Sequence, residues 1–226
     1  VLLPRMEAEG FWESVLMPYV LGAYFGGVGF LANMDRPRWA AAGGGAGNLI
    51  RRSAYDAVGG HAALKDSVID DIHLALKTKR AGFRTRAVRA EDRVSVRMYR
   101  GFAGVVNGFT KNIAYALNGL LGAVLIALTA VITVFWVVPP IVLAAALFGA
   151  PVAPRDALVA AAAYALVVAA RLAAASVLRD KLWPAVTHPI MAAIWAFIFA
   201  RSLYQRIVRR RLVWRGREFD ARSARF

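Results

Sequence analysis

The 226-residue chain contains no cysteine. This absence excludes disulfides, thiolate zinc sites, iron–sulfur clusters and cysteine nucleophiles. Acidic residues are scarce, because 14 Asp and Glu stand against 29 Lys and Arg, for a formal net charge of +15. Histidine is also rare, and the three residues lack the spacing of a zinc site, so no zinc is expected. They are His61, His73 and His188.

Charged side chains are absent from one long stretch in the second half of the chain. Residues 112–154 are 43 consecutive positions without Asp, Glu, Lys or Arg. A membrane-spanning helix needs only about 20 apolar residues. Further apolar stretches follow, so the sequence predicts three hydrophobic blocks, near residues 117–150, 157–178 and 182–200.

The composition predicts an integral membrane protein, because hydrophobic residues make up 59% of the chain. The predicted parts are a cytosolic domain over 1–112, a transmembrane region over 113–200 and a basic cytoplasmic tail over 201–226. The tail holds nine arginines and two acids. Such cations stay on the cytoplasmic side, so we expect a multi-pass protein of the inner (cytoplasmic) membrane. Because the cations flank hydrophobic blocks, the membrane surface explains them and no nucleic-acid partner is expected.

The number of membrane crossings is ambiguous. The segment before the first block is basic like the tail, so both sides are expected in the cytoplasm and the number of crossings is even. Three blocks give an odd number. Three explanations remain open. Pro139-Pro140 can split the long block into a hairpin, or one block can lie in the interface instead of spanning the membrane. Alternatively, the long block is one kinked helix and the basic tail does not follow the rule that cations stay in the cytoplasm. We favour an even number.

Arg171 interrupts the second hydrophobic block. An arginine in the middle of a membrane costs roughly 2.5–3.5 kcal/mol on insertion scales. Its side chain can extend toward the basic end of the block at Arg179 and Lys181, or it can hold a lipid headgroup. The sequence leaves both explanations open.

The polar part is predicted to be mixed α/β. Residues 7–16 have the pattern of an amphipathic helix that ends near Pro18. A glycine cluster at 43–47 matches neither a Walker loop nor a dinucleotide fingerprint, and it is either a flexible loop or a place where the backbone approaches a ligand. Ser53-Ala54-Tyr55-Asp56 is a capping-box pattern, and the helix that it opens is expected to stop at Gly59-Gly60.

The stretch from Asp66 to Gly82 predicts a second helix, with Ile69, Ile72 and Leu76 on one face. Asp70 and Asp71 then lie in its first turn. The helix dipole alone favours acids there. Two carboxylates on a rigid helix start can also serve as a catalytic base and its partner.

A strand is predicted at 94–99, with Arg97 and Tyr99 on one face. The cations Arg97, Arg100 and Lys111 just before the membrane can hold a diphosphate. They can equally be a positive flank of the first membrane block.

Four passages together resemble the C-terminal half of family 2 inverting glycosyltransferases with membrane helices, in the subgroup of hopene-associated and carotenoid glycosyltransferases. The first is the glycine-rich segment and the helix after it, and the second resembles the family's Thr-Glu-Asp motif. The third joins the strand to the membrane, and the fourth resembles a Trp-x-Gly-Arg-x-aromatic tail. They occupy residues 42–60, 69–82, 96–112 and 214–219.

The chain departs from the family pattern in three ways. The acidic motif reads Ile69-Asp70-Asp71, so its first acid is shortened. The Gln-x-x-Arg-Trp motif of polysaccharide synthases is absent, which argues against a polymerase. No Asp-x-Asp occurs. We expect that the donor-binding half precedes Val1 and that the chain as it stands is inactive.

The resemblance implies a partial GT-A-type (Rossmann-like) α/β domain followed by transmembrane helices. It implies transfer of a sugar from a nucleotide sugar to a lipid acceptor. Asp71 would be the general base and Asp70 would orient it or bind the acceptor. The remaining implied substrate-binding residues are Gly43, Gly44, Gly45, Arg97, Arg100 and Lys111.

A divalent cation, Mg²⁺ or Mn²⁺, is implied for the complete enzyme, held by the half that is missing, with no metal ligands in this chain. The alternative is a non-catalytic membrane scaffold or transport component, whose cytosolic part binds partners and whose acid pair only caps a helix. Transporters usually contain internal repeats, and none is found in this sequence. The sugar, the lipid and the oligomeric state are not determined by the sequence.

Overall fold

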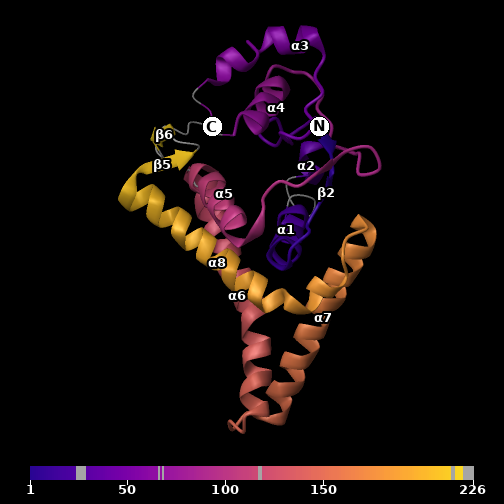
Figure 1. Ribbon diagram of the computed structural model, residues 1–226, viewed down its shortest axis with the longest axis vertical. Helices are drawn as coiled ribbons and strands as arrows, with labels where there is room; N and C mark the ends of the chain where they lie inside the picture. The colour runs from indigo at the N-terminus through magenta and orange to yellow at the C-terminus, as the bar shows by residue number, and fades with distance from the viewer. Residues whose placement is uncertain (24–28, 66, 68, 117–118, 215–216, 221–226) are drawn as a thin grey trace.

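The computed structural model describes the whole chain except residues 24–28, 66, 68, 117–118, 215–216 and 221–226. Helices account for most of the described chain (Figure 1). The α-helices are α1 (Phe11–Ala23), α2 (Gly29–Ala32), α3 (Arg52–Ala57), α4 (Asp70–Arg80), α5 (Gly101–Ala116), α6 (Gly119–Leu147), α7 (Pro154–Leu178) and α8 (His188–Tyr204). Shorter turns of helix are η2 (His61–Leu64), η3 (Trp183–Thr187) and η4 (Gln205–Arg209).

The strands are short and form three separate pairs. Their bounds are β1 (Leu2–Leu3), β2 (Arg5–Met6), β3 (Val88–Arg89), β4 (Ser95–Val96), β5 (Arg211–Trp214) and β6 (Arg217–Asp220). Strand β1 pairs in parallel with β3, β2 pairs in parallel with β4, and β5 and β6 form an antiparallel hairpin. Within the described residues no sheet has more than two strands.

The predicted Rossmann-like α/β domain is therefore wrong for the described chain. The strand expected at 94–99 shrinks to two residues, and its neighbourhood explains why. The side chain of Arg97 leaves the ladder to pair with Glu13 on α1. Gly101, with a positive φ of 64°, then turns the chain into α5. Tertiary contacts of single side chains thus override the alternating pattern.

Helices α6 and α7 form a long antiparallel hairpin that projects from the polar part (Figure 1). A break at Pro139-Pro140, one of the three explanations left open for the odd number of blocks, is not observed, because both prolines lie inside the continuous helix α6. Prolines are tolerated in membrane helices, where neighbouring groups satisfy the freed backbone. At its end α7 returns to the polar part, since Arg179 pairs with Asp92 at 3.0 Å and Arg89 donates to the carbonyl of Val177 at 3.1 Å.

Three helical stretches are long and apolar enough to cross a membrane: 126–147, 154–178 and 183–209. This supports the predicted membrane association. The three differ in their surroundings, because only 11% and 6% of the most apolar windows in the first two are buried, against 39% in the third. Helices α6 and α7 thus present apolar surface outward, while α8 is partly covered by protein.

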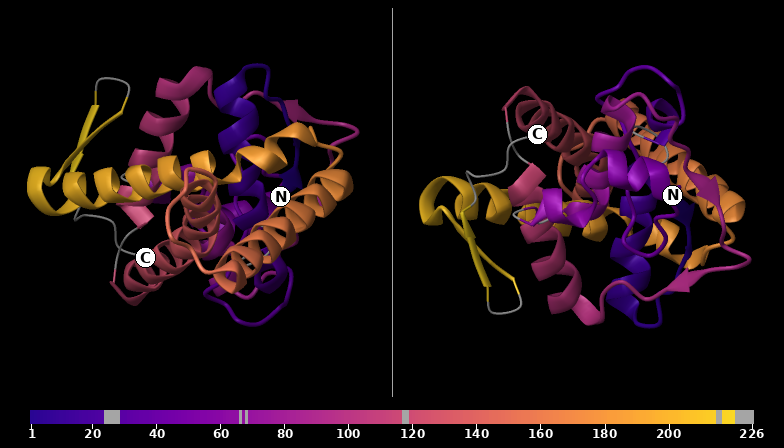
Figure 2. Two further views of the ribbon diagram at one scale, coloured as in Figure 1. Left: turned by 90° about the horizontal axis from the view of Figure 1, so that it is seen from below. Right: turned by 90° about the horizontal axis from the view of Figure 1, so that it is seen from above.

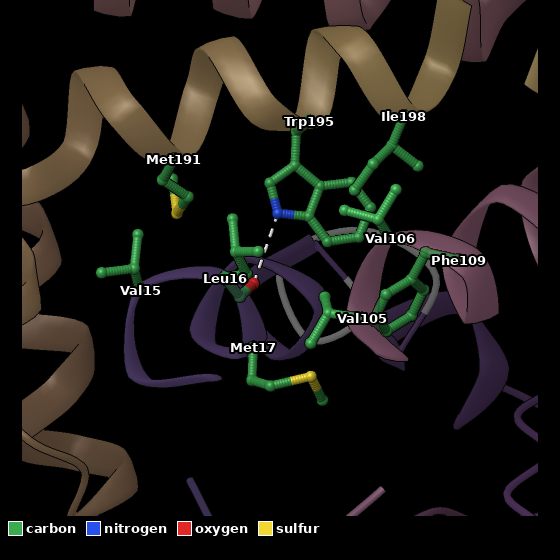
Figure 3. Packing of buried hydrophobic residues seen from close by; sticks show 9 residues of the cluster. All are labelled: Val15, Leu16, Met17, Val105, Val106, Phe109, Met191, Trp195 and Ile198. Carbon is green, nitrogen blue, oxygen red and sulfur yellow. Dashed lines mark hydrogen bonds between the residues drawn. The ribbon is translucent and has the colours of Figure 1, made fainter. Parts of the chain in front are cut away.

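Helix α8 packs against α1 and α5 and forms the main hydrophobic core (Figure 3). Trp195 on α8 points at α1, where its indole N–H donates to the carbonyl of Leu16 at 3.3 Å. Further along, the hydroxyl of Ser202 donates to the carbonyl of Thr110 on α5 at 3.0 Å. Two views show that α8 crosses between the polar part and the α6–α7 hairpin instead of running beside the hairpin (Figures 1 and 2).

The sequence predicted that this helix ends near Pro18, and the same core explains why α1 does not end there. The helix continues through Pro18 to Ala23. Val15, Leu16 and Met17 are almost fully buried in the core. Their burial, at roughly 1.5–3 kcal/mol for each large side chain, offsets the cost of the proline, about 3 kcal/mol.

A buried ion pair joins α1 to the start of α5. The carboxylate of Glu13 is 1% exposed, and it accepts hydrogen bonds from Arg97 Nε at 2.9 Å, Arg97 Nη2 at 2.8 Å and the Gly101 N–H at 2.8 Å. The hydrogen bond from Arg97 lowers the pKa of Glu13 to about 2. Glu9 also pairs with Arg97 from a more exposed position.

Glu13→Gln tests this ion pair through the dependence of stability on pH. Because the folded-state pKa is lowered, the carboxylate stabilises the protein above its ordinary pKa of 4.5 and loses this effect as the pH falls toward about 2. At neutral pH we expect Glu13→Gln to lower the free energy of unfolding by about 3 kcal/mol, since it removes the buried partner of Arg97 and leaves that charge with only the more exposed Glu9. The gap to wild type should shrink on acidification from about pH 5 to pH 3.

The measurement is denaturant unfolding in detergent micelles, followed by circular dichroism. Glu9→Gln is the matched control, because Glu9 contacts the same Arg97 while its side chain is 66% exposed. We expect a loss below about 1 kcal/mol for the control, as for exposed ion pairs in general. Equal losses for both variants at every pH would contradict the role assigned to Glu13.

Candidate functional site

The glycine segment packs directly against the first turn of α4. A Cβ atom added to Gly43 would overlap the carbonyl oxygen of Asp71 and the Cα of Ile72. A Cβ at Gly45 would lie 3.7 Å from Oδ2 of Asp71, an ordinary contact. Two of the regions that carried the resemblance, 28 residues apart at Gly43 and Asp71, therefore lie in contact.

Asn48 holds this arrangement together. Its side-chain amide donates to the carbonyl of Asp71 at 3.4 Å, and its side-chain oxygen accepts from the backbone N–H of Gly44 at 3.3 Å. The glycine segment is thus an ordered wall beside Asp71. Sequence reasoning singled out the glycines and did not identify Asn48, although an asparagine directly after the cluster is a typical turn and bridging residue.

Helix α4 begins at Asp70 and ends at Arg80, followed by Gly82 with a positive φ of 94°, so the predicted helix and its glycine stop are observed. Oδ1 of Asp70 accepts from the Asp71 N–H at 3.1 Å, and Oδ1 of Asp71 accepts from the Ile72 N–H at 2.8 Å. Both acids therefore help to cap the helix. Oδ2 of Asp71 has no hydrogen-bond partner in the described part of the chain, and it faces the glycine segment.

The helix that follows the glycine segment differs from its prediction at one end. Helix α3 begins at Arg52 with Arg51 as its N-cap, and no side chain caps it, so the predicted capping box at Ser53 is wrong. The backbone enters the helix two residues earlier than the box requires, because the N-cap is Arg51 and not Ser53. The predicted stop is observed, because Gly59 and Gly60 have positive φ angles of 79° and 51°.

Tyr99, in the third region of the resemblance, packs against α5. Its ring packs on Gly108, where an added Cβ would overlap it, and its hydroxyl accepts from the Asn112 side chain at 3.4 Å. Burial raises the pKa of Tyr99, and the negative charge of Asp71 acts in the same direction. Tyr99 is therefore within electrostatic reach of the acid pair.

His73 also belongs to this neighbourhood. It lies two residues after Asp71 on α4, is nearly buried, and shares a hydrogen bond of 2.7 Å between its Nδ1 and the hydroxyl of Ser67. Burial lowers its pKa, with the charge of Arg80 as the next cause, so the imidazole is neutral near pH 7. From the sequence, His73 was considered only as a possible zinc ligand and rejected for its spacing, so its place beside the acid pair was missed.

The three cations assigned to a diphosphate are placed differently from one another. Arg97 is bound to the carboxylates of Glu13 and Glu9, which offset its charge. Lys111 is 9% exposed on α5, and Arg100 is exposed at the start of that helix. Arg97 is therefore a structural residue of the α1–α5 junction.

A cavity of about 530 Å³ lies next to Asn48, and its lining is basic. Arg51, Arg84 and Arg86 line it, and Arg86 is paired with Asp35 at 2.8 Å. Arg51 lies four residues after the glycine segment, so its closeness to that segment could be read from the sequence. Arg84 and Arg86 come from the turn after α4, and only the fold brings them here.

The described residues offer no ready metal site. No group of three or more His, Cys, Asp or Glu lies together in the part of the chain that the structure describes. Asp70 and Asp71 are a pair without a third ligand. The divalent cation implied by the resemblance was assigned to the missing half, so the described residues do not test that prediction.

Comparison of the chain with protein-family models, curated proteins and solved structures found no match. The fourth passage of the resemblance lies partly outside the described residues, because 215–216 separate β5 from β6. The pairing of these strands sets Trp214 opposite Arg217.

Gly43→Ala tests the close approach of the glycine segment to α4. The new Cβ would overlap backbone atoms of Asp71 and Ile72, which cannot rotate away. We expect a loss of about 1–3 kcal/mol in stability, as for overpacked cores, measured by denaturant unfolding in micelles. Gly45→Ala is the matched control, because its Cβ finds ordinary contact distances. A Gly43→Ala protein as stable as the control would contradict the packing described.

Proposed function

We propose that the protein is a membrane-bound inverting glycosyltransferase that moves a sugar from a nucleotide sugar to a lipid acceptor. The proposal starts from the resemblance in the four sequence passages. Its main structural support is the contact of the glycine segment with Asp71, whose Oδ2 has no hydrogen-bond partner among the described residues and lies beside an ordered backbone wall. The proposal does not rely on the Rossmann-like domain that the resemblance implied.

Asp71 acts as the general base in the proposed reaction. Its Oδ2 takes the proton of the acceptor hydroxyl while that oxygen attacks the anomeric carbon. The bond between the anomeric carbon and the diphosphate oxygen breaks with its electron pair on the diphosphate, and the configuration inverts. A positioned base of this kind contributes about 10²–10⁴ in rate. Asp70 positions it, because its Oδ1 accepts the Asp71 N–H.

The charge of the leaving diphosphate requires cations near the acid pair. Arg100 and Lys111 keep this role in the proposal, while Arg97 does not, because Glu13 and Glu9 offset its charge. The basic cavity beside Asn48 supplies further cationic groups. We derive no step through a divalent cation, since the described residues do not form a site for one.

We infer that α6 and α7 cross the membrane and that α8 lies in its interface. Both ends of the α6–α7 hairpin meet the polar part, where α7 ends at the Arg179–Asp92 ion pair. Helix α8 then packs along α1 and α5 through Trp195 and Ser202. This arrangement has two crossings and keeps the polar part and the tail on one side, which is the cytosolic side because the cations gather there.

The arrangement suits a lipid acceptor. Aromatic rings are exposed around the junction of α1, α5 and η3: Phe11 is 49% exposed and stacks on Trp183 with ring centres 5.4 Å apart. Trp12 lies 5.0 Å from the ring of Phe102. Such rings are favoured at the headgroup level of a bilayer. A lipid can thus keep its chains in the bilayer while its hydroxyl reaches the polar part.

Asp71→Asn tests the proposed reaction, with the protein expressed from its complete reading frame. Membranes carrying it are assayed with labelled nucleotide sugars and their own lipids. Because the amide cannot accept the hydroxyl proton, we expect the rate to fall by about 10²-fold or more. Asp70→Asn should lose less, since Asp70 acts through Asp71. Asp56→Asn is the control, because its exposed side chain pairs only with Arg52 in the described structure.

Two results would contradict the proposal. Transfer by Asp71→Asn within about threefold of wild type is too small a loss for a general base and would remove Asp71 from that role. Failure of the wild-type membranes to bind any nucleotide sugar would favour the alternative, a membrane scaffold whose acid pair only caps α4.

Single-cysteine labelling tests the membrane arrangement, and the absence of native cysteine means that the background is clean. Ala150→Cys lies between α6 and α7, Ser53→Cys lies in the polar part, and Val208→Cys lies after α8; all three native side chains are exposed. With an impermeant maleimide on intact cells, we expect labelling of Ala150→Cys only. Labelling of Val208→Cys from outside would show that α8 spans the membrane.

A further inference from the structure

A second cavity lies within the membrane part, away from the acid pair. It encloses about 350 Å³ between α6, α7, the start of α8 and the middle of α1. This volume is within the range of sites that bind small molecules, roughly 300–1,000 Å³. Most of its lining is apolar, with Ile132 and Trp136 from α6 and Val167 and Ala174 from α7.

Among the described residues, two side chains in this cavity have buried nitrogen atoms without a hydrogen-bond partner. Both ring nitrogens of His188 are buried without a hydrogen bond, and the residue is 1% exposed. Nε of Arg171 is also buried without a partner, and within the described structure its guanidinium has no carboxylate within ion-pair distance. Buried polar groups are nearly always hydrogen-bonded, and leaving one unpaired costs about 1–3 kcal/mol. A ligand that supplies oxygen acceptors would satisfy these groups.

The other charged groups of the cavity already have partners. Lys181 donates to the carbonyl of Ala8 at 2.6 Å and to the hydroxyl of Ser14 at 3.2 Å. Asp180 accepts from the backbone N–H of Lys181 at 2.8 Å through Oδ1. Among the described residues, the cationic group of this cavity with a buried nitrogen that lacks a hydrogen bond is therefore Arg171, through its Nε, two turns before the end of α7. A guanidinium matches a phosphate or carboxylate in geometry and charge.

We propose that this cavity binds one anionic lipid of the bilayer, with its acidic headgroup on Arg171 and His188 and its chain against the apolar walls. A lipid fits better than a soluble anion, because α6 and α7 expose apolar surface on both sides of the cavity. It fits better than a neutral lipid, because Asp180, an acid that lines the same cavity, is not within ion-pair distance of Arg171. The ring of Trp136 closes one side, 4.0 Å from the ring of His188.

Bound lipid would stabilise the junction between the hairpin and the polar part. Trp136 on α6 also contacts Tyr19 on α1 at 5.7 Å between ring centres, and Tyr19 contacts Trp195 in the main core at 4.5 Å. Aromatic contacts thus connect the cavity to the core that α8 forms with α1 and α5. The inference does not depend on sugar transfer, since it concerns a separate site and its test measures binding.

The test is native mass spectrometry of the protein released from nanodiscs that contain equal amounts of phosphatidylglycerol and phosphatidylcholine. We expect wild type to retain one phosphatidylglycerol in preference to phosphatidylcholine. Arg171→Gln and His188→Phe should lower the retained phosphatidylglycerol about tenfold, the typical effect of losing a hydrogen bond to a charged group. Arg155→Gln is the matched control, because Arg155 lies at the other end of the same helix and is exposed.

A second pair of variants tests the cavity without removing a charge. Ala174→Phe fills the cavity, while Ala173→Phe, on the neighbouring position of α7, does not line it. We expect loss of the lipid only in Ala174→Phe, with unchanged circular dichroism in both. Retention of phosphatidylglycerol by Arg171→Gln or by Ala174→Phe at the wild-type level would overturn the proposal. Equal retention of the two lipids by wild type would overturn the assignment of an anionic headgroup.

Discussion

The packing of α8 on α1 and α5 is the contact on which the rest of the structure depends. It joins residues near positions 16, 109 and 195 in one core, so it closes the chain over almost its whole length. Because α8 is packed against the polar part, both ends of the α6–α7 hairpin must lie next to the polar part. The same contact keeps α1 helical through Pro18 and sets the cavity beside His188.

Some polar side chains in this fold have hydrogen-bond or ion-pair partners, and others have none among the described residues. Arg97 is matched by Glu13, and the buried Lys79 donates to the carbonyls of Leu31, Ala32 and Ala40. These buried cations hold loops and helices together. In contrast, Oδ2 of Asp71 and the guanidinium of Arg171 lie beside an ordered wall or a cavity without partners in the described structure. Groups of this second kind are where ligands are expected.

Local signals in the sequence predicted the acid-pair helix and its surroundings well. Asp70 and Asp71 begin α4 and Gly82 ends it, because dipole matching and a glycine stop act within a few residues. The resemblance implied that Gly43, Gly44 and Gly45 bind substrate, and Gly43 contacts Asp71. Asn48 and the arginines of the basic cavity were not identified, because their roles arise from contacts between segments far apart in sequence.

Composition and charge by themselves determined that this is a membrane protein with polar and apolar parts, since apolar runs and flanking cations follow from transfer energies alone. Only the tertiary structure decided how the parts are arranged. The expected Rossmann-like sheet is reduced to pairs of short strands, the double proline lies within α6, and Arg97 is committed to Glu13. In each case the observed arrangement is stabilised by burial against a segment far away in the sequence, and a local sequence pattern cannot indicate such a contact.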